Sequence, residues 1–175
     1  PIADGIGIQD HYVKTWAMLA ARYKNDKNLI GIDVMNEPFI GSAVENVLGI
    51  LITKITQALN KSSTVKKYEI EEVAAMWLDE KGKNFILKKL TDPEIFIDVL
   101  TAIEPIYKEF EENSLVPFYN RFAIAVRNVN PHHILFWEPS VSSNNGIPTS
   151  IKPIATAGKQ QGYMPHFYDI VLDTD

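Results

Sequence analysis

The sequence predicts an α/β protein whose strands lie parallel in one sheet. Two short apolar runs, residues 29–35 and 134–137, have the length and composition of strands buried on both faces, and a Glu-Pro pair follows each closely. Segments with helical spacing precede and separate these runs. This order is typical of β/α units with polar residues at the carboxyl ends of the strands, and both an α/β barrel and an open doubly wound sheet fit it.

The first element is a helix. Apolar residues at helical spacing, among them Tyr12, Trp16 and Leu19, indicate a helix over residues 9–24, and polar turn residues then end it. The strand over 29–35 follows. It stops at Asn36-Glu37-Pro38, because polar residues and a proline ring do not continue a buried strand.

A long helical stretch separates the two strands. Helical spacing covers residues 44–59, 68–78, 84–90, 95–110 and 116–127. The second strand ends at Glu138-Pro139, a loop rich in Ser, Asn and Gly follows over 140–146, and residues 162–168 are a third strand candidate. Three strands cannot close a barrel, whose usual size is about 250 residues, so in a barrel this chain would form the middle part.

Composition and charge exclude several classes of protein. With 46% hydrophobic residues among 175, the chain can bury a substantial core. Its 17 Lys and Arg against 22 Asp and Glu give a net charge of −5 without a basic block, so we expect no nucleic-acid partner. It has no cysteine, which excludes disulfides and cysteine-ligated zinc. No apolar stretch approaches the roughly 20 residues of a membrane-spanning helix. The chain begins with Pro1, and we expect it to start inside a longer gene product.

The strongest candidate for catalysis is Glu37, at the end of the first apolar strand. A carboxyl group at the edge of an apolar sheet is partly desolvated, which disfavours its charged form and raises its pKa. Such a group suits general acid catalysis near neutral pH. Asn36 beside it offers an amide for a substrate hydroxyl. The alternative is that the tripeptide only forms a turn or a helix cap.

These residues resemble a known family. Residues 16–24 and 29–38 resemble the third helix and fourth strand of glycoside hydrolase family 5, in which the acid/base Glu follows an Asn on strand four. Residues 164–169 resemble the family's His-x-Tyr motif at strand six, in the form found in its endoglycoceramidase-like branch. That branch carries a helical insertion after strand four, similar to residues 41–113. The resemblance implies that residues 1–175 are the central part, about strands 4 to 6, of a (β/α)8 barrel catalytic domain.

The resemblance also implies roles for individual residues. Glu37 would be the general acid/base and Asn36 would bind the sugar 2-hydroxyl. His166 and Tyr168 would line the subsite and orient the nucleophile. The family's nucleophile is a second Glu at the end of strand seven, which would lie beyond Asp175. The sequence itself has no His-x-x-x-His spacing, no phosphate-binding Gly-rich loop and no dinucleotide fingerprint, so we expect no metal and no cofactor.

Glu138 and Trp137 are further candidates at the end of the second strand. Their placement before a proline mimics that of Asn36 and Glu37, and they could contact substrate, with Trp137 stacking on a sugar face. The alternatives are a hydrogen-bonded carboxylate at a strand end and a tryptophan of the core. The resemblance places Glu138 at strand five, which is not where the nucleophile of the family stands.

The substrate is expected to be a β-linked glycan or glycolipid. The endoglycoceramidase-like features favour a glycolipid and therefore peripheral contact with a membrane or micelle, while a cellulase-like glucanase of the same family is the first alternative. An apolar face in the insertion would either pack against other helices or bind lipid; it consists of Val47, Leu48, Leu51, Ile52, Ile55 and Leu59. Secreted or periplasmic location follows from the resemblance alone.

Two other classes of protein stay open on the sequence. One is a noncatalytic carbohydrate-binding fragment that holds Glu37 without a nucleophile. The other is a purely helical interaction domain, which would require that no buried parallel sheet forms. Because an incomplete barrel would expose sheet edges, we expect the remainder of the barrel to exist as another segment or chain.

Overall fold

The computed structural model describes residues 2–167 and divides into two compact units. The first unit contains the residues up to Phe39 together with Glu109–Ser143 and Thr149–His166, and it holds the sheet. The second unit contains Ile40–Lys108 with the short segment Asn144–Pro148, and its main elements are helices. The predicted α/β class is therefore confirmed in the first unit.

Three parallel strands form the sheet in the order β3 (Gly31–Asp33), β4 (Ile134–Trp137) and β5 (Gln161–Tyr163). The strand predicted over 134–137 has these bounds in the structure. β3 is shorter than the predicted strand 29–35. β5 begins one residue before the predicted strand 162–168 and ends at Tyr163, and residue 168 lies outside the described residues. After each of these strands one backbone hydrogen bond continues the pairing. Val34 N–H still donates to Phe136 O at 3.3 Å and Met164 N–H to Trp137 O at 3.1 Å, and the chain then turns away.

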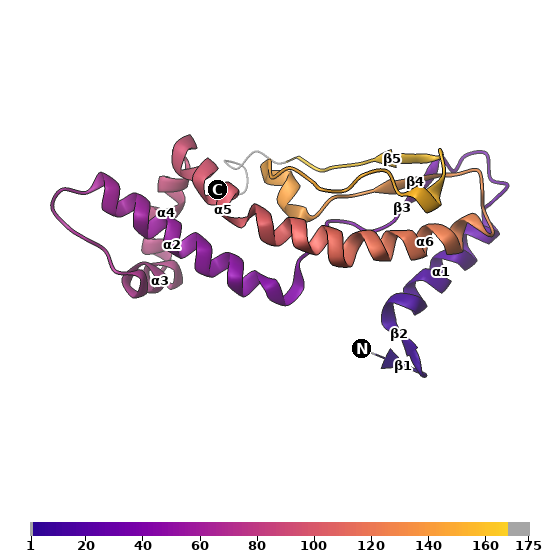
Figure 1. Ribbon diagram of the computed structural model, residues 1–175, viewed down its shortest axis with the longest axis horizontal. Helices are drawn as coiled ribbons and strands as arrows, with labels where there is room; N and C mark the ends of the chain where they lie inside the picture. Colours follow the sequence, from indigo (N-terminus) through magenta and orange to yellow (C-terminus); the bar gives the residue numbers. More distant parts are fainter. Residues whose placement is uncertain (1, 168–175) are drawn as a thin grey trace. The chain divides into compact units, whose positions relative to one another are not determined.

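Two helices, α1 (Ile8–Arg22) and α6 (Val116–Arg127), pack against one another and cover one face of the sheet. Figure 1 shows α6 running along the strands. Side chains alternate along a strand, and the buried Ile32, Leu135 and Trp137 share the core with aromatic residues of α6. The runs that predict the strands are therefore apolar because their side chains pack against these two helices.

The opposite face of the sheet has an alternation of large and small residues. Phe136 on β4 lies between Gly31 on β3 and Gly162 on β5. A Cβ atom on Gly31 would come within 2.6 Å of the Phe136 ring, and one on Gly162 within 2.8 Å. The two glycines therefore leave the space that the phenylalanine ring fills.

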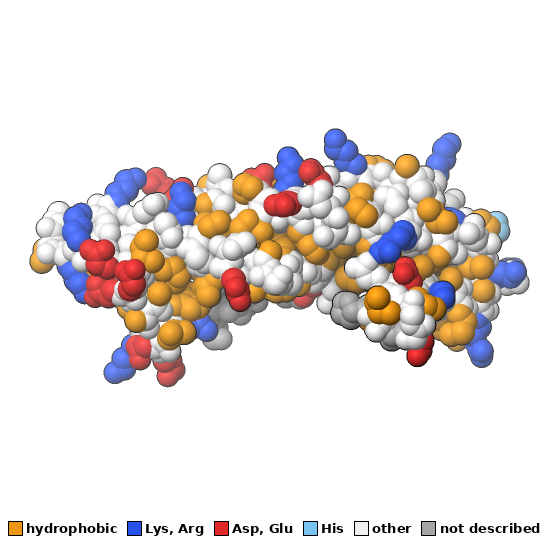
Figure 2. All heavy atoms as spheres, turned by 60° about the horizontal axis from the view of Figure 1, so that its bottom comes forward, with side chains coloured by type: hydrophobic (Ala, Val, Ile, Leu, Met, Phe, Trp, Pro, Cys, Tyr) orange, Lys and Arg blue, Asp and Glu red, His pale blue; other side chains and the backbone are white. Residues whose placement is uncertain are grey.

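The segment expected to be a helical insertion, 41–113, contains four α-helices, and a π-helix begins near its end. The helices are α2 (Val44–Ser62), α3 (Ile70–Leu78), α4 (Glu80–Leu90) and α5 (Pro93–Phe110), and the π-helix is Glu111–Leu115. The carboxyl-terminal part of the apolar face predicted for 44–59 is buried among helices through Ile52, Ile55 and Leu59, whereas Leu48 is exposed. Figure 2 shows exposed hydrophobic side chains among acidic and basic ones over the α2–α4 region, at its left.

Several short elements were not predicted. The described part of the chain begins with a hairpin of β1 (Ile2–Ala3) and β2 (Ile6–Gly7), paired antiparallel around Asp4 and Gly5, both of which have positive φ. The loop over 140–146 contains a 3-10 helix, Val141–Asn145, and another, Ala155–Ala157, precedes β5. These elements are too short for a periodic signal. Within the described part of the chain, no helix has the length and apolar character needed to cross a membrane.

Candidate active site

The candidate site lies at the carboxyl edge of the parallel sheet. Glu37 follows β3, Glu138 follows β4 directly, and His166 follows β5. Because the strands are parallel, their carboxyl ends lie at the same edge, where polar side chains of distant sequence can meet. The structure brings these three residues together.

His166 stands between the two glutamates. Its Nδ1 lies 2.9 Å from Glu37 Oε1, and its Nε2 lies 3.2 Å from Glu138 Oε1. The backbone N–H of Glu37 donates to the other oxygen of Glu138 at 2.7 Å. Each of the three residues therefore contacts both of the others.

Glu138 is the buried member of the group. Its side chain is 2% exposed, while those of Glu37 and His166 are 30% and 28% exposed. Desolvation raises the pKa of Glu138 above its usual value; the N–H bond from Glu37 opposes this shift, and the nearby Asp33 carboxyl reinforces it. The sequence led us to expect the desolvated carboxyl at Glu37. In the structure the deeply buried carboxyl is that of Glu138, whose Oε2 accepts the backbone N–H of Glu37.

The backbone at Glu37 is in the left-handed region, with φ of 46°. A residue with a Cβ atom rarely adopts this conformation, and it persists where surrounding contacts hold it. Here the Glu37 N–H is held by Glu138 and its carboxylate contacts His166. The turn directs the Glu37 side chain toward His166.

The charge around His166 is negative. The hydrogen bond to Glu37 is the main cause that raises the pKa of His166 above its usual value, and the charges of Glu138, Glu37 and Asp33 add to it, against partial desolvation. Among the described residues, three carboxyl groups thus act on one imidazole ring, two by contact and Asp33 through its charge. This arrangement favours the imidazolium form and suits a site where positive charge develops on a substrate.

The other predicted site residues have different surroundings. Asn36 is exposed beside Glu37. Trp137 is 3% exposed, its ring centroid is 4.9 Å from that of Tyr119, and its indole N–H donates to Gln161, so it is a core residue here. Tyr168 lies outside the described residues.

Two contributors were missed at the level of sequence. Asp33 interrupts the apolar run of β3, and its charge raises the pKa of Glu138 and His166. A charged residue inside a buried strand was the available signal. Tyr119 is fully buried on α6 and donates its hydroxyl to the Glu138 carbonyl at 2.7 Å. Nothing in the sequence distinguishes it from other aromatic residues of that helix.

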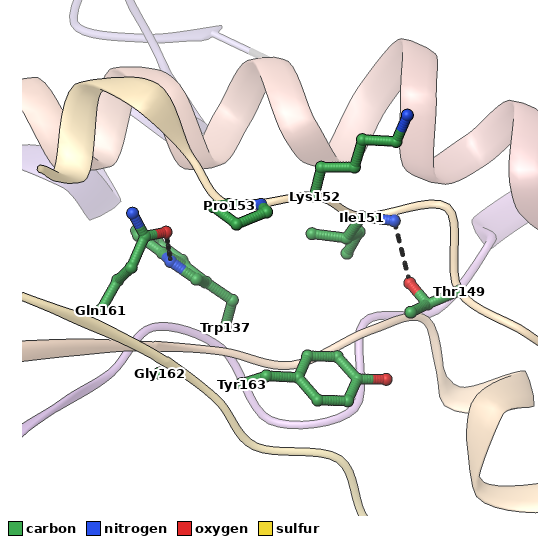
Figure 3. Close-up of a pocket in the computed structure, with 8 residues that line it drawn as sticks. All are labelled: Trp137, Thr149, Ile151, Lys152, Pro153, Gln161, Gly162 and Tyr163. Carbon is green, nitrogen blue, oxygen red and sulfur yellow. Dashed lines mark hydrogen bonds between the residues drawn. The ribbon is translucent and has the colours of Figure 1, made fainter. Parts of the chain in front are cut away.

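A separate pocket of about 260 Å³ lies on the helix-covered side of β4 and β5. Figure 3 shows the lining residues, which come from the two strands and the segment around Pro153: Trp137, Thr149, Ile151, Lys152, Pro153, Gln161, Gly162 and Tyr163. The amide of Gln161 is engaged by Trp137 and by backbone groups of Ile154 and Gly158. The pocket includes none of Glu37, Glu138 and His166, so we do not assign it to the candidate site.

The candidate site therefore consists of Glu37 and His166, supported by Glu138, Asp33 and Tyr119. No group of three or more histidine, aspartate or glutamate side chains in residues 2–167 is arranged to hold a metal ion. The chain matches no protein-family model, and neither a curated protein nor a solved structure shows significant similarity to it.

Proposed function

We propose that this chain is the central part of a retaining glycoside hydrolase with Glu37 as the general acid/base. The observation that carries the proposal is the contact between Glu37 and His166. Each belongs to one of the two strand-end motifs that resemble glycoside hydrolase family 5, and their side chains meet at 2.9 Å. The edge of the sheet where they meet is the edge at which barrel enzymes carry their active sites.

The sheet supports the barrel part of this proposal. In a (β/α)8 barrel, the side chains of one interior layer come from alternate strands. Phe136 on β4, flanked by Gly31 and Gly162 on its two neighbours, fits such a layer. Within residues 2–167, β3 and β5 each pair with a strand on one side only. Their other edges are available to further strands of a barrel, which are part of the proposal.

The proposed reaction is a double displacement. Glu37 protonates the leaving oxygen while a second carboxylate attacks the anomeric carbon; Glu37 then takes a proton from the water that releases the sugar. The two carboxyl groups must stand about 5 to 5.5 Å apart on either side of the bond that breaks. Glu138 is too deeply buried to attack a sugar. We therefore propose that the nucleophile is a glutamate beyond Asp175, on another strand of the barrel.

The proposed substrate is a β-linked glycolipid. The endoglycoceramidase-like features of the sequence support this choice. An apolar hollow of about 280 Å³ includes in its lining Pro38 and Phe39, the two residues that follow Glu37 in the sequence, together with Tyr12, Met35 and Phe118, although it does not include Glu37 itself. Such a surface suits the apolar part of a leaving group. A soluble glucan has no lipid chain to bind in this hollow, so the rates of hydrolysis of a glycolipid and of a soluble glucan should be compared. Activity on the glucan alone would exclude the glycolipid.

The acid/base assignment is tested with Glu37→Ala in the full-length protein. Aryl glycosides with poor leaving groups should lose about 10²–10⁴-fold in rate, because the leaving oxygen is no longer protonated. With activated leaving groups, for which release of the sugar limits the rate, azide should restore turnover and give a glycosyl azide of retained configuration, because azide attacks the glycosyl-enzyme from the space of the missing Glu37 carboxylate and needs no general base. Glu112→Gln, a change at an exposed glutamate, is the control. Unchanged turnover of poor leaving groups would exclude the assignment.

A further inference from the structure

Asp33 and Glu138 lie on the face of the sheet that is opposite the covering helices. Ile32 and Trp137, which precede them, are buried in the core with α1 and α6, and side chains alternate along a strand. Asp33 pairs in register with Phe136, which is two residues before Glu138. The two carboxyl groups are therefore diagonal neighbours across β3 and β4, a separation that long side chains can bridge.

One oxygen of each of these carboxyl groups is buried without a donor. The Glu138 side chain is 2% exposed, and its Oε2 accepts the backbone N–H of Glu37 at 2.7 Å. Glu138 Oε1 and Asp33 Oδ1 are both buried, and neither accepts a hydrogen bond from any residue in 2–167. His166 Nε2 lies 3.2 Å from Glu138 Oε1, but the two atoms make no hydrogen bond. Buried polar atoms normally have partners, so two such oxygens on one face of the sheet call for an explanation.

We propose that Asp33 and Glu138 share one proton, held between these two oxygens. A hydrogen bond between two carboxyl groups requires that one of them is protonated, because a carboxylate only accepts. One proton then gives both oxygens a partner, and Glu138 Oε2 remains the acceptor for the Glu37 N–H. Burial disfavours a charge on Glu138, which points to Glu138 as the donor and Asp33 as the acceptor.

The charges around the pair support a shared proton. The pKa of Glu138 is raised, first by burial and then by the charge of Asp33 and a hydrogen bond between the two side chains, while the Glu37 N–H and His166 oppose the shift. The titratable residues that contact Glu138 are Glu37 after β3, His166 after β5 and Tyr119 on α6. Among these described residues, His166 is the one that can be a cation. Without the shared proton, one imidazolium would have to offset three carboxylates.

The pair is a positioning device for Glu37, and this part of the inference rests on the proposed function. A neutral Glu138 can stay buried while it accepts the N–H of the left-handed turn at Glu37. The pair then places one negative charge near Glu37 and not two. Because a like charge raises the pKa of a carboxyl group, the shared proton keeps Glu37 able to ionise before it takes a proton from water.

The first test is infrared spectroscopy of the full-length protein near neutral pH, where a protonated carboxyl group has its own C=O stretching band. We expect Glu138→Gln and Asp33→Asn each to remove the same band, because the remaining carboxylate then accepts from an amide N–H. Glu112→Gln, at an exposed position, should leave the band unchanged. A band that is lost in only one of the two variants, or in neither, would overturn the proposal. Absence of any protonated-carboxyl band in the wild type would overturn it even if the variants fail to fold.

The second test is the pKa of His166, measured by NMR in the same protein with His166→Asn to assign the signals. Asp33→Asn leaves one negative charge on the pair, as the shared proton does, so the pKa of His166 should not fall. Glu37→Gln should lower it, because the hydrogen bond to Glu37 is the main cause of the raised value. A lower pKa of His166 in Asp33→Asn would overturn the proposal, because it would show that Asp33 and Glu138 are both ionised. If Glu37→Ala leaves poor leaving groups unaffected, the proposed function fails, while these two measurements still decide whether the proton is shared.

Discussion

Glu37 Oε1 lies 2.9 Å from His166 Nδ1, although 129 residues separate the two in the chain. The contact exists because each residue follows a strand of one parallel sheet, and the intervening strand β4 holds both strands in register. A one-residue slip of either strand would turn its side chains to the opposite face and change where the following turn begins. The geometry of the candidate site therefore depends on the register of the sheet.

The left-handed conformation of Glu37 predicts an inversion of the usual preference between alanine and glycine. With φ of 46°, glycine fits without the steric cost that a Cβ atom incurs, which is about 1 kcal/mol or somewhat more. Glu37→Gly should therefore have a higher free energy of unfolding than Glu37→Ala by about that amount. Chemical denaturation of the two variants measures the difference, and both lack the carboxyl group.

Glu109, exposed within α5, is the matched control for this comparison. At a helical position glycine is less favourable than alanine by about 1 kcal/mol, so the order of the two variants should be reversed there. If alanine were the more stable substitution at both sites, the left-handed turn would not be a property of the folded protein.

The environment of His166 predicts a dependence of stability on pH. The pKa of His166 is raised above 6.5, mainly by its hydrogen bond to Glu37. A raised pKa in the folded state gives a stabilising contribution that is fully present below pH 6.5 and is lost as the pH rises through the folded-state value. The free energy of unfolding of the wild type, minus that of His166→Asn, should therefore be constant below about pH 6.5 and decrease as the pH rises above that value.

Glu37→Gln provides the control, because it removes the main cause of the raised pKa. In that background the folded-state pKa of His166 is less raised, so the decrease should end at a lower pH and be smaller. Thermal unfolding over the same range of pH gives the measurement. A difference between wild type and His166→Asn that does not change with pH would contradict the contact with Glu37.

Much of the sheet could be predicted from the sequence, but which carboxyl group of the candidate site is buried could not. The run Ile134–Trp137 is apolar throughout and β4 has these bounds, because burial of both faces leaves a direct compositional signal. The meeting of Glu37 and His166 follows from parallel strands that end at one edge. Which carboxyl is buried depends on the side-chain direction at Glu138 and on the left-handed turn at Glu37, and neither has a periodic signature. The aromatic ring of Trp137 is of the kind that stacks on sugars, but it packs in the core, because side chains alternate along β4 and that of Trp137 faces α6.

Glu111 is expected to be among the most sensitive positions for stability. It is 1% exposed at the start of the π-helix, and its two oxygens accept five hydrogen bonds from Ser140, Thr149 and Ser150, at 2.6 to 2.9 Å. Glu111→Gln places NH2 hydrogens opposite these donors. We expect the free energy of unfolding to fall by about 3 kcal/mol.

Glu112→Gln at the adjacent exposed position is the control and should change stability by no more than about 0.5 kcal/mol. Urea denaturation compares the two variants. Similar small effects at both positions would show that the loop after β4 does not depend on the buried carboxylate.

The alternation of Gly31, Phe136 and Gly162 predicts different outcomes for two alanine substitutions. In Gly162→Ala the atoms nearest the new Cβ are ring carbons of Phe136 at 2.8 Å. In Gly31→Ala a ring carbon of Phe136 lies at 2.6 Å, but the backbone oxygen of Ile134 is nearer still, at 2.5 Å. Each should destabilise the protein by about 1–3 kcal/mol through overpacking.

Phe136→Ala removes the ring but not the backbone oxygen. In double-mutant cycles it should therefore offset much of the cost of Gly162→Ala, with a coupling of about 1 kcal/mol or more, and little of the cost of Gly31→Ala. Equal coupling at the two glycines would show that the ring, and not the backbone, limits the space on both sides, and absence of coupling at Gly162 would contradict the proposed layer of alternate strands.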